Sequence, residues 1–113
     1  MTTLKDLKNV LKGQIFNTAI AATTNFFTTS LAPFWTPSKF NIYICMSAGG
    51  TLTLTRKSGA TTITETLNGG TALTANVAYQ LSVMVDAGET VNLQYSAAAT
   101  ILKCNVCEVA LST

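Results

Sequence analysis

The residues best suited to chemistry in this chain are Cys104 and Cys107, which stand in the sequence CNVC. A CxxC pair can supply half of a tetrahedral zinc site or a redox-active dithiol. A zinc site needs four ligands, yet the only further thiol is Cys45, because the chain has 3 cysteines and 0 histidines. The surrounding residues alternate as in a strand, where positions i and i+3 face opposite sides, so a Cys104–Cys107 disulfide would distort it. We therefore expect no metal and no cofactor, and we interpret these thiols as small buried apolar side chains.

The sequence also has few residues suited to acid–base or nucleophilic catalysis. Histidine, the usual general base and the partner of serine and cysteine nucleophiles, does not occur in the sequence. The acidic residues are dispersed, and the closest pair, Asp86 and Glu89, is explained by a turn between strands. No two carboxylates stand out as the opposed pair that a glycosidase needs. We therefore expect no catalytic residues and no enzyme activity.

Charge is scarce in this chain of 113 residues, which is long enough for one domain. Charged residues make up 11% of it, against about a quarter in ordinary soluble domains, and hydrophobic residues make up 48%. Solubility normally depends on surface charge. The composition therefore indicates either a neutral surface rich in hydroxyl and amide groups or, as we favour, a surface largely covered by neighbouring subunits.

Charge, hydropathy and cysteine content also indicate which partners and which cellular location to expect. The net charge of +2 is small and dispersed, which argues against a nucleic-acid partner. No run approaches the roughly 18 apolar residues of a membrane span, so we expect no membrane contact. The start of the chain lacks the apolar core of a signal peptide, and the odd number of cysteines fits a reducing compartment. We therefore expect a protein that is made in a cytoplasm.

The sequence begins MTTLKDLKNVLKG, which has the pattern of a short helix. Leu4, Leu7 and Leu11 fall on one helical face, lysines occupy the other, and Gly13 can end the helix in a left-handed conformation. We predict an N-terminal helical arm over residues 1–13. A helix of about two turns is marginal alone, so its leucine face should dock either on its own domain or on a neighbouring subunit.

From residue 14 to residue 113 the pattern is that of an all-β domain. Seven to nine short strands, separated by turn signals such as KSGA, NGG and DAGE, predict a jelly-roll-like β-sandwich. Apolar residues alternate with polar ones along these strands, which places one face of each in the core. The predicted core residues are Phe40, Ile42, Ile44, Leu52, Leu54, Ile63, Leu81, Val83, Val91 and Leu93.

The segment APFWTPS interrupts the strand pattern. Pro33 and Pro37 remove donors from a strand ladder, which confines this segment to a loop or a sheet edge. Phe34 and Trp35 lie between the two prolines. They would either plug one end of the core or, together with Tyr43, form a stacking platform for a ligand or a partner.

Residues 47–109 resemble the small β-rich virion proteins of tailed bacterial and archaeal viruses, especially decoration or other head-surface subunits. The resemblance lies in a tyrosine-led strand at residue 79, the turn AGETVN at 87–92 and linkers of small residues. It implies a non-enzymatic subunit that decorates or stabilises a capsid, located in the virion and made in the host cytoplasm. It also implies that the partners are the chain itself, commonly as a homotrimer, and a major capsid protein or other virion protein.

Two functions therefore remain open at this point. For a capsid subunit, the candidate subunit contacts are the leucine face and the aromatics between the prolines, that is Leu4, Leu7, Leu11, Phe34 and Trp35. The alternative is a carbohydrate- or ligand-binding β-sandwich that uses Trp35, Phe34 and Tyr43. Aromatic residues beside prolines serve either role.

Overall fold

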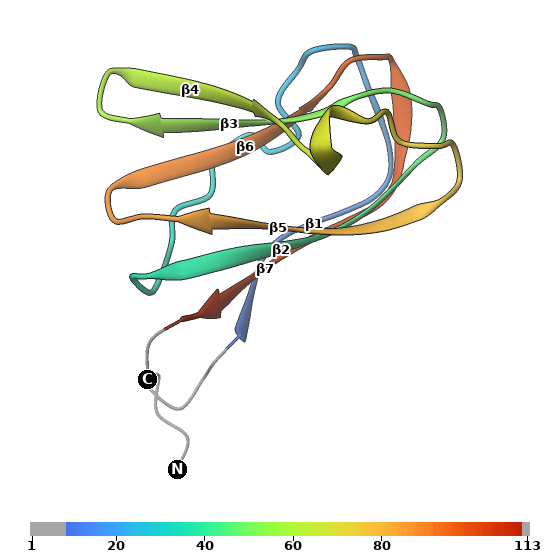
Figure 1. Ribbon diagram of the computed structural model, residues 1–113. Helices are drawn as coiled ribbons and strands as arrows, with labels where there is room; N and C mark the ends of the chain where they lie inside the picture. Colours follow the sequence, from blue (N-terminus) through green and yellow to red (C-terminus); the bar gives the residue numbers. More distant parts are fainter. Residues whose placement is uncertain (1–8, 112–113) are drawn as a thin grey trace.

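Two antiparallel sheets face each other in the computed structural model, which describes residues 9–111 (Figure 1). The first, sheet A, has the strand order β1-β7-β2-β5, and the second, sheet B, has the order β4-β3-β6. The elements along the chain are β1 (Asn9–Ile20), β2 (Ser38–Met46), β3 (Leu52–Ser58), β4 (Thr61–Thr66), the 3₁₀ turn η2 (Asn68–Gly70), β5 (Ala78–Val85), β6 (Glu89–Tyr95) and β7 (Ala99–Ala110).

The strand pairing is that of a jelly roll. The segment 21–31 has no regular strand, but it runs beside β6 through backbone bonds that join Thr23 to Tyr95, Phe26 to Leu93 and Leu31 to Val91. If that segment is counted as the second strand, the pairs are first with last, second with seventh, third with sixth and fourth with fifth. This is one long antiparallel hairpin rolled into two layers. The predicted jelly-roll-like sandwich is confirmed.

The core lies between the two sheets and follows the predicted alternation. Eight of the ten predicted core residues are buried, and Leu81 packs against the core while partly exposed. The prediction for Ile63 is wrong, because its side chain is 53% exposed. Ile63 lies on β4, the edge strand of sheet B, which packs against β3 and has little of sheet A beneath it.

The N-terminal arm departs from the prediction. Residues 1–8, which include Leu4 and Leu7, lie outside the described residues. Residues 9–13 do not form the end of a helix, since they are the start of β1 and pair with the end of β7. The ladder with β7 supplies backbone bonds at alternate residues, whereas a two-turn helix is weak alone. The predicted boundary at residue 14 thus falls inside β1, which the structure describes from Asn9.

In the segment 21–31, a buried side-chain amide makes hydrogen bonds that a regular strand would otherwise make. The side chain of Asn92, on β6, accepts a hydrogen bond from the N–H of Phe27 at 3.0 Å and donates one to its carbonyl at 2.8 Å. The ring of Phe27 lies over Gly13, where an added Cβ would be 2.5 Å from the ring. Gly13 is thus required for this close approach and not for ending a helix. Asn92 lets an irregular segment close sheet B without leaving buried backbone groups unpaired.

We predict that Asn92→Ala lowers the free energy of unfolding by about 3 kcal/mol, since both backbone groups of Phe27 lose their partner in a buried site. Urea unfolding followed by circular dichroism measures this. Gln94→Ala is the matched control, because Gln94 also lies on β6 but makes its hydrogen bond to Asn25 at the surface. The control should cost less than about 1 kcal/mol. Equal losses in the two variants would contradict the role assigned to Asn92.

Candidate functional site

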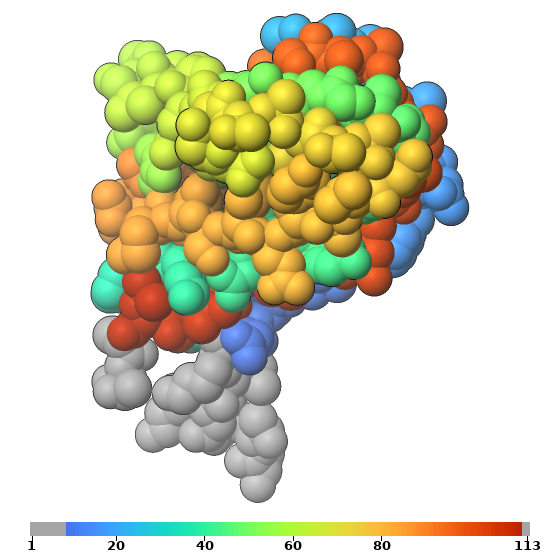
Figure 2. Space-filling model, turned by 45° about the vertical axis from the view of Figure 1, so that its right-hand side comes forward, coloured from blue at the N-terminus to red at the C-terminus, as the bar shows by residue number. Residues whose placement is uncertain are grey.

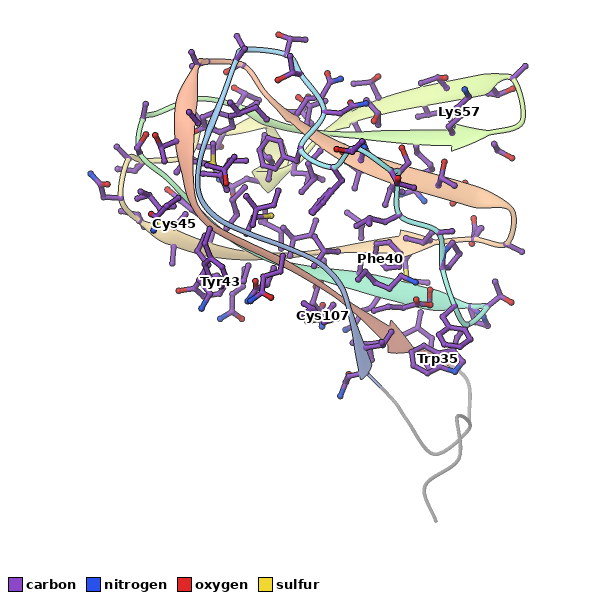
Figure 3. All side chains as sticks on the ribbon, turned by 180° about the vertical axis from the view of Figure 1, so that it is seen from behind. Trp35, Phe40, Tyr43, Cys45, Lys57 and Cys107 are labelled. Carbon is purple, nitrogen blue, oxygen red and sulfur yellow. The ribbon has the colours of Figure 1, made fainter. Side chains whose placement is uncertain are left out.

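The loop between the two prolines displays an aromatic pair at the surface. The rings of Phe34 and Trp35 are stacked, with centroids 5.4 Å apart and planes inclined by 21°. Phe34 is 51% exposed and Trp35 is half-buried, so the pair does not plug the core. Figure 3 shows Trp35 beside the end of β7. Of the two roles predicted for the pair, a plug of the core and a surface platform, only the surface platform fits this exposure.

A fully buried carboxylate holds this loop in place. Glu108, on the inward face of β7, accepts hydrogen bonds from the N–H of Phe34 at 2.6 and 2.7 Å and from the N–H of Trp35 at 2.7 Å. Charge-assisted bonds of this kind are about twice as strong as neutral ones. The backbone beneath both aromatic side chains is therefore fixed before any partner arrives.

Lys12 completes the surroundings of that carboxylate. Its Nζ lies 3.5 Å from Glu108 Oε1 and 5.8 Å from the centre of the Phe34 ring. The pairing of β1 with β7 shifts between Leu11 and Gly13, so Lys12 is the extra residue of a β-bulge. A bulge re-aims a side chain, and here it turns the lysine toward the buried acid.

Sequence reasoning missed this arrangement. It treated Lys12 as part of a solvated helix face and Glu108 as one of several scattered acids. One signal was available in the sequence: Cys104, Val106 and Glu108 follow one another at the spacing of a single strand face, and the first two are apolar. An acid that continues an apolar face is buried and needs donors. The partners themselves could not be read, because they come from a bulge and a loop.

We predict that Glu108→Gln lowers the free energy of unfolding by about 3 kcal/mol, because Lys12 loses its partner ion and the backbone donors lose a charged acceptor. The emission of Trp35 should move to longer wavelength as the loop loosens. Asp86→Asn, the same exchange at an exposed turn, is the control and should change the stability by less than about 0.5 kcal/mol. A Glu108→Gln protein as stable as the control would show that the carboxylate does not hold the loop.

Tyr43 is not part of the aromatic pair. It lies on the outer face of sheet A, the side turned away from sheet B, about 17 Å along β2 from the strand end that adjoins the loop. The amine of Lys103 lies 5.2 Å from its ring centre and 5.8 Å from that of Phe16. The platform of three aromatics expected for a carbohydrate-binding module is therefore not formed.

Tyr43 instead borders a shallow hollow of about 540 Å³ on that outer face. Its polar lining includes Asn41, Gln80, Ser82 and Asn105. Within the described residues, the buried Oδ1 of Asn105 has no hydrogen-bond partner. The hollow is thus a second candidate site, lined by amide and hydroxyl groups and separate from the aromatic loop.

The cysteine pair is divided between the two faces of β7. Cys104 points into the core and is fully buried, whereas Cys107 is half-buried and paired with Leu11 and Asn41 on the outer face (Figure 3). The predicted opposition of positions i and i+3 is confirmed. Burial raises the pKa of the Cys104 thiol to about 12. Across residues 9–111, no cluster of three or more histidine, cysteine or acidic side chains is placed to hold a metal.

We predict that a thiol reagent at pH 8 modifies two of the three cysteines of the folded protein, Cys45 and Cys107. Cys104 should react only in denaturant, because a thiol with a pKa of about 12 is almost wholly protonated at that pH and is shielded from the reagent. Absorbance titration with and without urea counts the reactive thiols. Rapid reaction of all three in the native protein would contradict this placement.

Glu65 and Glu89 form ion pairs with one arginine, Arg56. Arg56, on β3, bonds to Glu65 at 2.7 Å, to Glu89 at 2.8 Å and to the carbonyl of Met84 at 2.6 Å. Burial lowers the pKa of Arg56, but the bonds to both carboxylates outweigh it and raise the pKa overall. The backbone N–H of Asp86 and then Arg56 lower the pKa of Glu89. Through these bonds Arg56 joins β3 to β4, β5 and β6, so the role of both acids is structural.

Comparison with known proteins gives limited similarity. No protein-family model matches the sequence, and no curated protein matches it either. Among solved structures, one from work on Bacillus endospore appendages that form a family of disulfide-linked pili is 19% identical, with a TM-score of 0.49, and the match covers 93% of this chain and 90% of that one. A pentameric capsid protein from metagenomic phage sequences is 16% identical, with a TM-score of 0.43 over 96% of this chain. The match spans 65% of the capsid protein, less than two thirds of its length.

The described part of the chain contains no helix that is long and apolar enough to cross a membrane.

Proposed function

We propose that this protein is a non-enzymatic structural subunit of a virus particle, which decorates or stabilises the capsid through protein–protein contacts. The observation that carries the proposal is the exposed aromatic pair, Phe34 and Trp35, on a backbone fixed by the buried Glu108. Its partners are other copies of this chain, in a homo-oligomer such as the trimer implied by the resemblance, and a major capsid protein or another virion protein.

The aromatic loop suits a protein contact for two reasons. Aromatic anchors dominate binding energy at interfaces, and an anchor that is already rigid loses little freedom on binding. Leu111 adjoins the same loop, since its N–H bonds to the carbonyl of Pro37 at 3.1 Å, and its side chain is 40% exposed. We call Phe34, Trp35 and Leu111 the aromatic patch.

The use of charge supports the same role. Lys12, Arg56, Glu65, Glu89 and Glu108 are engaged in ion pairs within the domain. Because only 11% of the sequence is charged, few ions remain to cover the rest of the surface. A surface of this kind is suited to contact with neighbouring subunits.

Ligand binding is the second candidate, and one observation favours it. The hollow beside Tyr43 presents amides and a hydroxyl, which are the groups that bind sugar hydroxyls, and Asn105 Oδ1 has no partner there among the described residues. This candidate no longer includes Phe34 and Trp35, which lie at the far end of β2 from Tyr43.

The proposal predicts that the double variant Phe34→Ala, Trp35→Ala binds virus particles at least about tenfold more weakly than the wild type. The particles are purified from a producing strain that lacks this gene, and binding is measured by co-sedimentation. Ile63→Ala is the matched control, because Ile63 is as exposed as Phe34 but lies on β4. The control should bind like the wild type.

Two results would overturn the proposal. One is mass spectrometry of particles from the intact producing strain that finds no copies of the protein. The other is unchanged binding of the double variant. Binding of oligosaccharides that is lost in Tyr43→Ala, with no binding to particles, would favour the second candidate.

A further inference from the structure

The free edges of the two sheets are not equally protected. An edge strand offers unpaired N–H and C=O groups to other chains, and proteins usually blunt such edges with charges, prolines or bulges. The edge of sheet A formed by β1 carries the bulge at Lys12 and a positive φ of 46° at Asn17. At one edge of sheet B, the segment 21–31 has no regular strand, and at the other, β4 carries Glu65.

The edge formed by β5 has none of these devices. Its sequence, AYQLSVMV, contains no charged residue, no proline and no glycine, and it pairs with β2 over its whole length without a register shift. In Figure 2, β5 crosses the front of the molecule below the turn η2, with no other element over it. Residues Ala78, Gln80, Ser82 and Met84 are exposed.

The backbone groups on this edge can be assigned from neighbouring bonds. The carbonyl of Met84 accepts from Arg56, and the N–H of Asp86 donates to Glu89, so these even-numbered residues turn their groups away from β2. Because the direction alternates along a strand, Gln80 and Ser82 also turn their N–H and C=O groups outward. Arg56 and Glu89 thus close one end of the edge, and its middle stays open.

We propose that β5 pairs antiparallel with β5 of a second copy across a two-fold axis at Leu81, which joins the two A sheets into one. Gln80 then lies opposite Ser82 of the second copy and exchanges two backbone bonds with it, as does the symmetric pair. Ala78 lies opposite Met84, so the smallest side chain on this face meets the largest. This register places polar beside polar and covers Met84, which is 53% exposed in the single chain.

A second copy is the best fit among strands of this protein. The partner must present a straight, uncharged edge of similar length, and of the edges described above only β5 itself does so. The inference rests on the proposed structural role and names one of its self-contacts. It involves a different surface from the aromatic patch, so each can fail without the other. A two-fold contact between copies adds to whatever contacts form a trimer.

Gln80→Pro tests the pairing directly. The substitution removes an outward N–H and leaves the ladder with β2 intact, because proline is tolerated where the N–H of an edge strand faces solvent. We expect the wild type to have twice the mass of the variant in light scattering. Thr64→Pro is the matched control: Leu67 bonds to Leu52 of β3, so even-numbered residues of β4 face outward, and this variant should keep the wild-type mass.

A cross-link tests the register in a folded, full-length chain. In the proposed pairing Leu81 faces its own copy in a non-hydrogen-bonded pair, with Cα atoms about 4.5 Å apart, which a disulfide can span. With Cys45 and Cys107 replaced by Ser, Leu81→Cys should form a covalent dimer on oxidation, and Tyr79→Cys, which faces Val83, should not.

Three results would overturn the inference. They are a wild-type protein with the mass of a single chain, 11.9 kDa, a Gln80→Pro variant with the wild-type mass, and equal cross-linking of the two cysteine variants. None of them would change the binding of particles through the aromatic patch, which Phe34 and Trp35 test separately.

Discussion

A carboxylate without access to water must find all its donors inside the protein, and Glu108 finds them in two distant parts of the chain. Lys12 comes from a bulge in the first strand, and the two N–H groups come from the loop that leads into β2. Because the acid lies near the end of β7, these bonds fasten β1, β7 and the aromatic loop at one point. The position of the aromatic patch, and hence the candidate contact, depends on this one ion.

Two other polar side chains also connect separate parts of the fold. Arg56 ties two acids and a carbonyl across the strands β3, β4, β5 and β6, and Asn92 supplies by its amide the bonds that a regular strand would have made. These polar groups join parts of the fold. The outer face of sheet A carries amides, hydroxyls and two lysines, Lys39 and Lys103, beside exposed apolar side chains such as Phe16 and Met84. A domain built in this way can repeat in close contact with its copies without strong repulsion.

The alternation of apolar residues made the sandwich and most of its core predictable, because a strand that faces both a core and solvent must repeat every two residues. Ile63 follows the same alternation but is exposed. The alternation shows which residues share one face of a strand, but it does not show whether another element covers that face. The N-terminal leucines followed a helical period, yet residues 9–13 pair with β7, because a tertiary ladder outweighs a weak local preference. Lys12 and Glu108 could not be paired from sequence, since a bulge has no reliable signature there.

The antiparallel pairing of β1 with β7 also decides where this domain connects to anything else. Asn9 lies opposite Val109, and Leu111 is bonded to the loop of Phe34 and Trp35. The chain therefore enters and leaves the sandwich side by side, at the corner that carries the aromatic patch. A reporter protein or affinity tag fused at either end would be tethered to that corner, whereas the β3–β4 hairpin offers an attachment site on the other sheet.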